Sequence, residues 1–235
     1  MYEAVHAWPD GDSTVARLAE TASEYGYDGI VVRNAQEAGR DRASFADIRD
    51  ETGVDIVAAN QITSDDPQRA SGFVGNYRER DRLVIVGGGT NAINRFAVEQ
   101  ERVDVLAHPM RGDGDFNHVL ARAARDNGVR IEFDLSPVLR TTGGERVRAL
   151  KSLRKLRELV EQYDAPFVVS ATPRSHLHLR APRELAAVGE TIGFDPERIE
   201  AGLAEWDRLI ERNREIQSES FIEPGVERGR YDEDA

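Results

Sequence analysis

The sequence predicts a parallel α/β fold of the TIM-barrel type, and three features of its 235 residues support this class. Short apolar runs alternate with helical segments along nearly the whole chain. The runs lack polar alternation, which is typical of strands buried on both faces. They recur at roughly 25–35 residues, the length of one βα unit in such barrels. An open, doubly wound sheet is the competing arrangement.

Seven strands are expected, each followed by a helix. They are Tyr2–Val5, Gly29–Val32, Ile56–Ala59, Leu83–Val86, Val103–Ala107, Ile131–Phe133 and Phe167–Val169. A standard barrel of this type has eight strands. One strand is therefore weak or missing near Ala181–Phe194, and we expect an incomplete or irregular seven-stranded barrel.

The predicted helices carry apolar residues at helical spacing. Ser13 can cap the first helix, which ends before Gly26. The others cover residues 45–51, 67–80, 116–126 and 145–163, with one beginning at Asn91 and a last helix or helix pair at 196–217. Residues 1–217 should form a single βα barrel domain. Residues 218–235 contain Pro224, Gly225 and Gly229 and end in YDEDA, which indicates a flexible acidic tail.

Composition narrows the class of protein. The absence of cysteine excludes disulfides and thiolate-bound zinc. No run approaches a membrane span and the N-terminus reads directly as a strand, so we expect a cytoplasmic protein with no membrane partner. The net charge is −12, and only Lys151 and Lys155 among the 31 basic residues are lysines. Such a surface is typical of a salt-loaded cytoplasm, whereas an ordinary acidic enzyme with GC-rich codons is the alternative. Negative charge is then weak evidence against nucleic-acid binding.

Polar residues at the exits of the strands define a candidate site. In a parallel barrel these exits meet at one rim, which would bring together His6, Arg33, Asn60, His108, Asp134 and Ser170. His176 and His178 follow the last strand. Such a rim could hold a metal, but this pair of histidines has no acidic neighbour. We therefore expect hydrogen-bonded rim histidines, with no metal site and no tightly bound cofactor.

The glycine run Gly87–Gly89 lies between a strand and a helix, where backbone N–H groups can bind phosphate. The signal is weak because the run lacks the lysine of a P-loop and the spacing of a dinucleotide fingerprint. A tight barrel turn is the simpler interpretation. Arg95, on the helix that follows, could make a bidentate contact with a phosphate or carboxylate.

Basic residues form two groups. Between residues 140 and 157, seven basic residues accompany a single acid, Glu145. The apolar stripe of this helix is predicted to be Val147, Leu150, Leu153, Leu156 and Val160, which leaves the basic side chains exposed. Such surfaces suit a phosphate backbone or an acidic protein surface, and a solvated helix face is the alternative. The predicted RNA-binding or assembly residues are Arg146, Arg148, Lys151, Arg154, Lys155 and Arg157 on the helix, and Arg95, His108, Arg111, Arg174, His176, Arg180 and Arg183 elsewhere.

Several motifs resemble one family. They are Asn94-Arg95-x-Ala97-x-Glu99, Val103-Asp104-x-Leu106-x-His108-Pro109, Ile131-Glu132, Ser170-Ala171 and Ser175-His176-x-x-Leu179-Arg180-x-Pro182. From Tyr2 to about Ile216 the chain resembles archaeal ribonuclease P protein component 3, the counterpart of the thirty-kilodalton subunit of the eukaryotic enzyme. The resemblance implies a TIM-barrel-like fold and a subunit of the ribonucleoprotein that removes 5′ leaders from precursor tRNA. It also implies catalysis by the RNA with Mg²⁺, and as partners the ribonuclease P RNA, precursor tRNA, protein component 2 and the other ribonuclease P proteins.

That family is similar in turn to the PHP metal-dependent phosphoesterases, whose first strand ends in His-x-His. Here the matching residues are His6-Ala7-Trp8, and the late Asp-x-His element reads Ser170-Ala171-Thr172. Two missing ligands should abolish metal activation of water. The main hypothesis is therefore a non-catalytic, RNA-binding subunit of ribonuclease P, and the alternative is a PHP-like phosphoesterase acting on a small phosphate ester.

Overall fold

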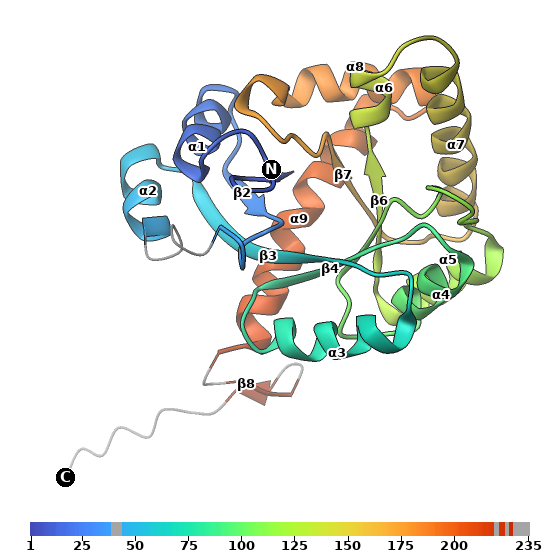
Figure 1. Cartoon of the computed structure of the whole chain (residues 1–235), viewed down its shortest axis with the longest axis horizontal. Coiled ribbons are helices and arrows are strands. Elements are labelled where there is room, and N and C mark those ends of the chain that lie inside the picture. Colours follow the sequence, from blue (N-terminus) through green and yellow to red (C-terminus); the bar gives the residue numbers. More distant parts are fainter. Residues whose placement is uncertain (39–43, 219–220, 224–225, 228–235) are drawn as a thin grey trace.

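Seven parallel strands form one sheet whose spatial order, β1 to β7, follows the chain (Figure 1). The structure is a computed structural model that describes residues 1–38, 44–218, 221–223 and 226–227. The strands are β1 (Tyr2–Val5), β2 (Gly29–Val32), β3 (Asp55–Thr63), β4 (Leu83–Gly87), β5 (Val105–Ala107), β6 (Arg130–Asp134) and β7 (Phe167–Ser170). The predicted seven-stranded, TIM-barrel-like fold is confirmed.

Helices connect the strands on the outside of the sheet. They are α1 (Val15–Glu24), α2 (Phe45–Thr52), α3 (Pro67–Arg78), α4 (Asn91–Val98), α5 (His118–Asn127), α6 (Ser136–Arg140), α7 (Gly143–Gln162), α8 (Pro182–Ile192) and α9 (Pro196–Ile216), with a 3₁₀ turn, η2, at His176–His178. The segment near Ala181–Phe194, where a standard barrel would have an eighth strand, forms α8. Its buried Leu185, Ala186, Gly189 and Ile192 recur at helical spacing.

Two local predictions were wrong. Thr14, not Ser13, caps α1, because its side chain accepts the N–H of Arg17. The Ser13 hydroxyl instead contacts Nδ1 of His176 at 2.9 Å. On α7, Val147 is 65% exposed, so the buried stripe begins later, at Leu153, Leu156 and Val160.

The barrel remains open between β1 and β7, which share no backbone ladder in the described part of the chain. The fully buried carboxylate of Glu3 bridges this gap by accepting the N–H groups of Ala4 and Ala171, both at 3.0 Å, and the hydroxyl of Ser170. Burial raises the pKa of Glu3 to about 7, and the nearby Glu132 adds to this, although the accepted hydrogen bonds oppose it.

Helix α9 covers the amino ends of the strands. Trp206, Leu209 and Ile210 pack inside the barrel, and the indole N–H of Trp206 donates to the carbonyl of Val169 at 2.9 Å. Towards its end, Asn213 donates to the buried Asp104, just before β5, at 2.9 Å. Figure 1 shows α9 crossing behind the strands. With this end covered, the carboxyl ends of the strands form the accessible rim.

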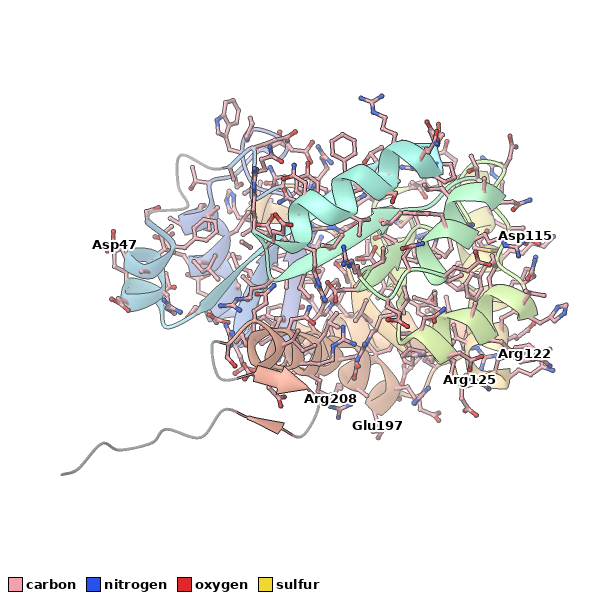
Figure 2. The ribbon with its side chains drawn as sticks, turned by 90° about the horizontal axis from the view of Figure 1, so that it is seen from below. Asp47, Asp115, Arg122, Arg125, Glu197 and Arg208 are labelled. Carbon is pink, nitrogen blue, oxygen red and sulfur yellow. The ribbon has the colours of Figure 1, made fainter. Side chains whose placement is uncertain are left out.

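The outer surface is charged, in keeping with the composition. Figure 2 shows Asp47, Arg122, Arg125, Glu197 and Arg208 projecting outward from α2, α5 and α9. Beyond α9, β8 (Phe221–Glu223) and β9 (Val226–Glu227) pair antiparallel within the segment predicted as a flexible tail. The rest of that segment after Ser218 lies outside the described residues, so its flexibility stays a prediction. No described helix has the length and apolarity required to cross a membrane.

Candidate nucleic-acid interface

A polar cavity of about 580 Å³ opens at the rim. Four residues predicted to converge there, His6, Arg33, Asn60 and His108, all line it. Asp134 lies beside His108 in a neighbouring cleft. Ser170 turns away to donate to Glu3. The sequence therefore predicted most of the rim, but not which side chains are occupied by internal bonds.

A buried ion pair crosses the barrel beneath this cavity. The two terminal nitrogens of the Arg33 guanidinium donate to the Glu132 carboxylate, one of them at 3.0 Å. The side chains of both residues are fully buried. The Nε of Arg33 donates to Gln61 Oε1 at 2.9 Å. Because Glu132 and Gln61 accept most of its N–H groups, Arg33 is held inside the barrel and is largely occupied by internal bonds.

His6 is held as a neutral group. Burial lowers its pKa most, the positive charge of Arg33 lowers it as well, and the neighbouring Asp10 only partly opposes both effects, so the pKa is about 4. The Nδ1 of His6 lies 2.5 Å from Asp10, and Arg174 contacts the same carboxylate from the other side at 2.5 Å. His6, Asp10 and Arg174 therefore form one linked group on this side of the cavity.

Asp134 is the centre of a second group. It accepts the hydroxyl of Thr172 at 2.7 Å and the N–H of Ser136 at 2.9 Å, and Nδ1 of His108 lies 3.2 Å away. Burial alone would raise the pKa of Asp134, but the bonds and the charge of His108 lower it to about 2. His108 and Thr172 have φ of 51° and 40°, a left-handed conformation that is rare outside glycine. Such backbone strain is concentrated at functional sites.

These donors do not fit a polynuclear metal centre of the PHP type. Trp8, where a second histidine would stand, is 63% exposed. Thr172, at the position of the late histidine, is bonded to Asp134, and His6 to Asp10. Within residues 1–38, 44–218, 221–223 and 226–227, no three histidine or carboxylate groups lie close enough together to share an ion.

The N–H groups of Gly88 and Gly89 in the glycine loop already donate hydrogen bonds within the protein. The N–H of Gly88 donates to the carbonyl of Ala107 at 2.7 Å and that of Gly89 to the side chain of Asn94 at 3.3 Å. The amide of the buried Asn94 also donates to the carbonyl of Pro109 at 2.7 Å. A side chain at Gly88 would collide with Asn94. These bonds favour the tight-turn interpretation of the loop over phosphate binding.

Arg95 and Arg111 lie in different surroundings. Arg95 is on the outer face of α4, where its side chain is 69% exposed and pairs with Glu99 at 2.8 Å. It does not line the polar cavity. Arg111 does, donating one N–H to the carbonyl of Gly88 at 3.1 Å. Arg111 has no carboxylate partner among the described residues.

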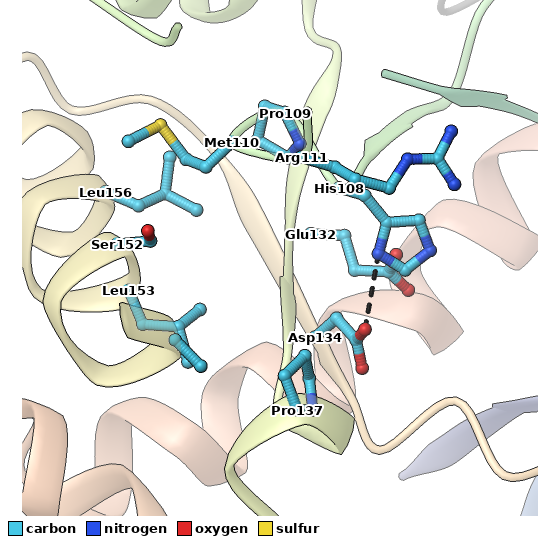
Figure 3. A pocket seen from close by; sticks show the side chains of 11 residues that line it. His108, Pro109, Met110, Arg111, Glu132, Asp134, Pro137, Ser152, Leu153 and Leu156 are labelled. Carbon is cyan, nitrogen blue, oxygen red and sulfur yellow. Dashed lines mark ion pairs between the residues drawn. The ribbon is translucent and has the colours of Figure 1, made fainter. Parts of the chain in front are cut away.

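Arg111 and His108 also line a second, mostly apolar cleft of about 340 Å³. Figure 3 shows Ser152, Leu153 and Leu156 of α7 facing the residues that follow β5 and β6 across this cleft. Two cavities of different character, one polar and one apolar, therefore share a wall.

The basic helix is only partly neutralised. Lys155 pairs with Asp115 at 2.6 Å and Arg157 with Glu161 at 2.7 Å. Arg146 and Arg154 donate to backbone carbonyls. Arg148 and Lys151 are exposed and have no polar partner in the part of the chain that the structure describes. Because α7 begins at the carboxyl end of β6, its first half, with Arg148 and Lys151, is the half near the rim.

The second basic group follows β7. Arg174 pairs with Asp10, and Arg180 donates to the carbonyls of Leu177 and Leu179 at 3.1 and 2.6 Å. His176 contacts Ser13. Arg183 is exposed and unpaired within the described residues. Arg180 and Arg183 are thus basic residues without a carboxylate partner, whereas Arg174 also holds the loop after β1.

The fold is a TIM-barrel-like scaffold of seven parallel strands, and the described residues at its rim do not form a metal centre with three ligands. Histidinol phosphate phosphatase from Lactococcus lactis shares this scaffold with a TM-score of 0.53 at 12% identity, over 82% of this chain and 94% of that chain. At such low identity the likeness concerns the fold alone.

The particular family follows from the sequence comparisons. The model of the family "RNase P subunit p30" matches residues 1–218, so the chain belongs to this family of ribonuclease P protein subunits. It is 63% identical to ribonuclease P protein component 3 of Haloarcula marismortui, over all of this chain and 98% of that protein. Identity to the Methanosarcina acetivorans protein of the same name is 34%, over 95% of this chain and 92% of that protein.

A solved structure agrees in fold. A chain in the cryo-EM structure of archaeal ribonuclease P with mature tRNA superposes with a TM-score of 0.85 at 22% identity, and the match covers both chains fully. The resemblance and the main functional hypothesis drawn from the sequence, a protein subunit of ribonuclease P, are confirmed over the phosphoesterase alternative.

Proposed function

We propose that this chain acts in ribonuclease P as a cytoplasmic RNA-binding and assembly subunit, and that it supplies no catalytic group of its own. The observation that carries the proposal is the set of exposed cations without carboxylate partners around the rim. Arg148, Lys151 and Arg183 are unpaired within the described residues, and the net charge of the chain is −12. Unneutralised arginine and lysine are what a phosphate backbone binds.

The partners follow from family membership. The ribonuclease P RNA and precursor tRNA are the nucleic-acid partners that we propose, with protein component 2 and the other ribonuclease P proteins as protein partners. Arg174, Arg180 and Arg183, beyond β7, would face RNA, together with the first half of α7. The second half of α7, where Arg154 is bonded to α8 and Arg157 is paired with Glu161, is the better surface for a protein partner.

The internal bonds of the rim histidines favour a role in supporting the RNA over a catalytic role. His6 is neutral and bonded to Asp10, and His108 is bonded to Asp134. The hydrolytic step is assigned to the RNA and its Mg²⁺, and this protein stabilises the RNA structure. No tightly bound cofactor of the chain is needed.

Salt dependence of RNA binding tests the proposal. Two charge-neutralised variants are compared with the wild type: Arg148→Gln with Lys151→Gln, and Arg180→Gln with Arg183→Gln. Each lost phosphate contact should flatten the slope of log K against log salt by about 0.7–0.9. Arg17→Gln is the matched control, because Arg17 lies on the exposed face of α1 and is paired with Glu20. It should leave the slope unchanged.

The same variants are titrated with component 2 at salt concentrations that keep the fold intact. A change in protein affinity with an unchanged RNA slope would assign that basic group to assembly. If neither affinity moves for either group, these surfaces are solvated faces and the proposed role of the cations fails.

A further inference from the structure

We propose that the cleft between α7 and the ends of β5 and β6 binds one unstacked nucleotide of RNA, with its base in the cleft and its phosphate on Arg111. This inference rests on the proposed function and names the ligand of one part of its interface. It concerns the apolar cleft, in which the predicted rim residues His108 and Asp134 meet α7, a contact that the sequence did not predict.

The shape and lining of the cleft suit a single base. Its volume of about 340 Å³ is near the lower end for ligand pockets. Met110, Leu153 and Leu156 provide apolar side chains, and Pro109 and Pro137 provide apolar rings (Figure 3). Proteins recognise RNA sequence chiefly through unstacked bases of single strands, because side chains cannot enter the deep, narrow major groove of duplex RNA.

The polar side of the cleft offers Arg111 and His108 to the phosphate and the base of a nucleotide. Arg111 lines both the apolar cleft and the polar cavity, and within the described residues only one of its N–H groups is engaged, on Gly88. His108 also lines both. Because ionised Asp134 holds Nδ1 of His108, the Nε2 atom is left for a ligand. A base on one side and a phosphate on the other would thus span the shared wall.

The charge around the cleft suits an anion, and cations on two sides of it suit the successive phosphates of RNA. The two carboxylates in the lining are both compensated, Glu132 by Arg33 and Asp134 by His108. Arg148 precedes Ser152 by four residues on α7, which places it on the same helix face one turn nearer the rim. Successive phosphates would therefore meet Arg111 and Arg148 on either side of the base.

The test uses a single-stranded RNA oligonucleotide carrying 4-thiouridine. After irradiation of the wild-type chain, adducts should map to residues 109–111 or 149–156. Ser152→Phe fills the cleft from an edge that is not part of the core, and should weaken oligonucleotide binding about tenfold and remove these adducts. Arg111→Gln should weaken binding and flatten the salt slope by about 0.7. Ser71→Phe, at an exposed serine on α3, is the matched control and should change nothing.

Each other outcome overturns the inference. Adducts that map elsewhere on the wild-type chain overturn it. This result needs no variant, so it holds even if the Ser152→Phe chain misfolds. Loss of component 2 binding in Ser152→Phe with unchanged RNA binding would make the cleft a protein anchor. If the charge-neutralised variants lose RNA affinity while Ser152→Phe does not, only this inference fails. A wild-type chain that binds no RNA would instead remove the proposed function itself.

Discussion

At the scale of single residues, buried charged groups occupy positions where an ordinary barrel has apolar side chains. Glu3 replaces the missing β1–β7 ladder with one carboxylate, and its pKa of about 7 means that ionisation in the folded state is unfavourable. Protonation of Glu3 stabilises the fold relative to the ionised form. This contribution is complete below the unfolded pKa of about 4.5 and is lost as the pH rises through 7.

Glu3→Gln should therefore change the pH dependence of stability. The free energy of unfolding of the variant minus that of the wild type should increase by about 3 kcal/mol between pH 4 and pH 8, because only the wild type loses the contribution of protonated Glu3. His6 acts in the opposite direction, because its pKa is lowered to about 4, so the difference between the two proteins is the quantity to measure. Denaturant unfolding at fixed salt gives it. A difference that does not vary with pH would contradict the assignment of this pKa to Glu3.

Arg33 and Glu132 should show strong energetic coupling. Removing one partner leaves a buried charge uncompensated, which costs about 3–5 kcal/mol, whereas removing both often costs far less. Arg33→Met and Glu132→Leu should each destabilise the chain severely, and the double variant should recover most of the loss. Unfolding free energies of the four proteins test this. Additive losses would mean that the two side chains do not form the pair.

The sequence predicted which residues reach the rim, since strand exits can be read from apolar runs. It could not predict that Arg33 pairs with Glu132, 99 positions away, because no local pattern links them. It also treated Asn94 and Asp104 only as motif residues. In the structure Asn94 joins the glycine loop to the loop after β5, and Asp104 binds Asn213 on α9.

At the scale of elements, α9 is the helix that covers the amino end of the barrel. Trp206 should be its most sensitive position, because it is fully buried inside the barrel and bonded to Val169. Trp206→Ala should lower the free energy of unfolding by about 3–5 kcal/mol. Trp206→Phe keeps most of the apolar volume but loses the hydrogen bond, so its cost should be smaller. Equal losses for the two variants, measured by thermal unfolding, would contradict this role.

The prediction of strands and helices succeeded where the apolar spacing was regular. It failed where that spacing did not determine what a helix packs against. Each strand contains a short, mostly apolar run, although Glu3 and Glu132 interrupt two of them, and the strand order follows the chain, so the existence of the strands was predictable. The position of α9 across the amino ends of the strands was not, since its apolar stripe would equally suit an outer helix. Val147 fits the apolar spacing of α7 but lies before the helix reaches the core, at 65% exposure.

At the scale of the whole molecule, an acidic surface coexists with unneutralised cations near one end of the barrel. The charged side chains of α2, α5 and α9 project to solvent (Figure 2), while the rim collects Arg111, Arg148 and Lys151. Salt screens long-range attraction, so the proposed RNA binding should depend on close contacts of these cations more than on the net charge.

Reconstitution of precursor-tRNA cleavage from the RNA and its protein partners, with and without this chain, tests the proposed subunit function most directly. We expect faster cleavage, or cleavage at lower Mg²⁺, when the chain is present, and weaker stimulation by the Arg148→Gln, Lys151→Gln variant. The chain alone should not cleave at any divalent metal concentration. Metal-dependent hydrolysis by the isolated chain that disappears in His108→Ala, or a reconstituted complex that cleaves equally well without the chain, would contradict the proposed function.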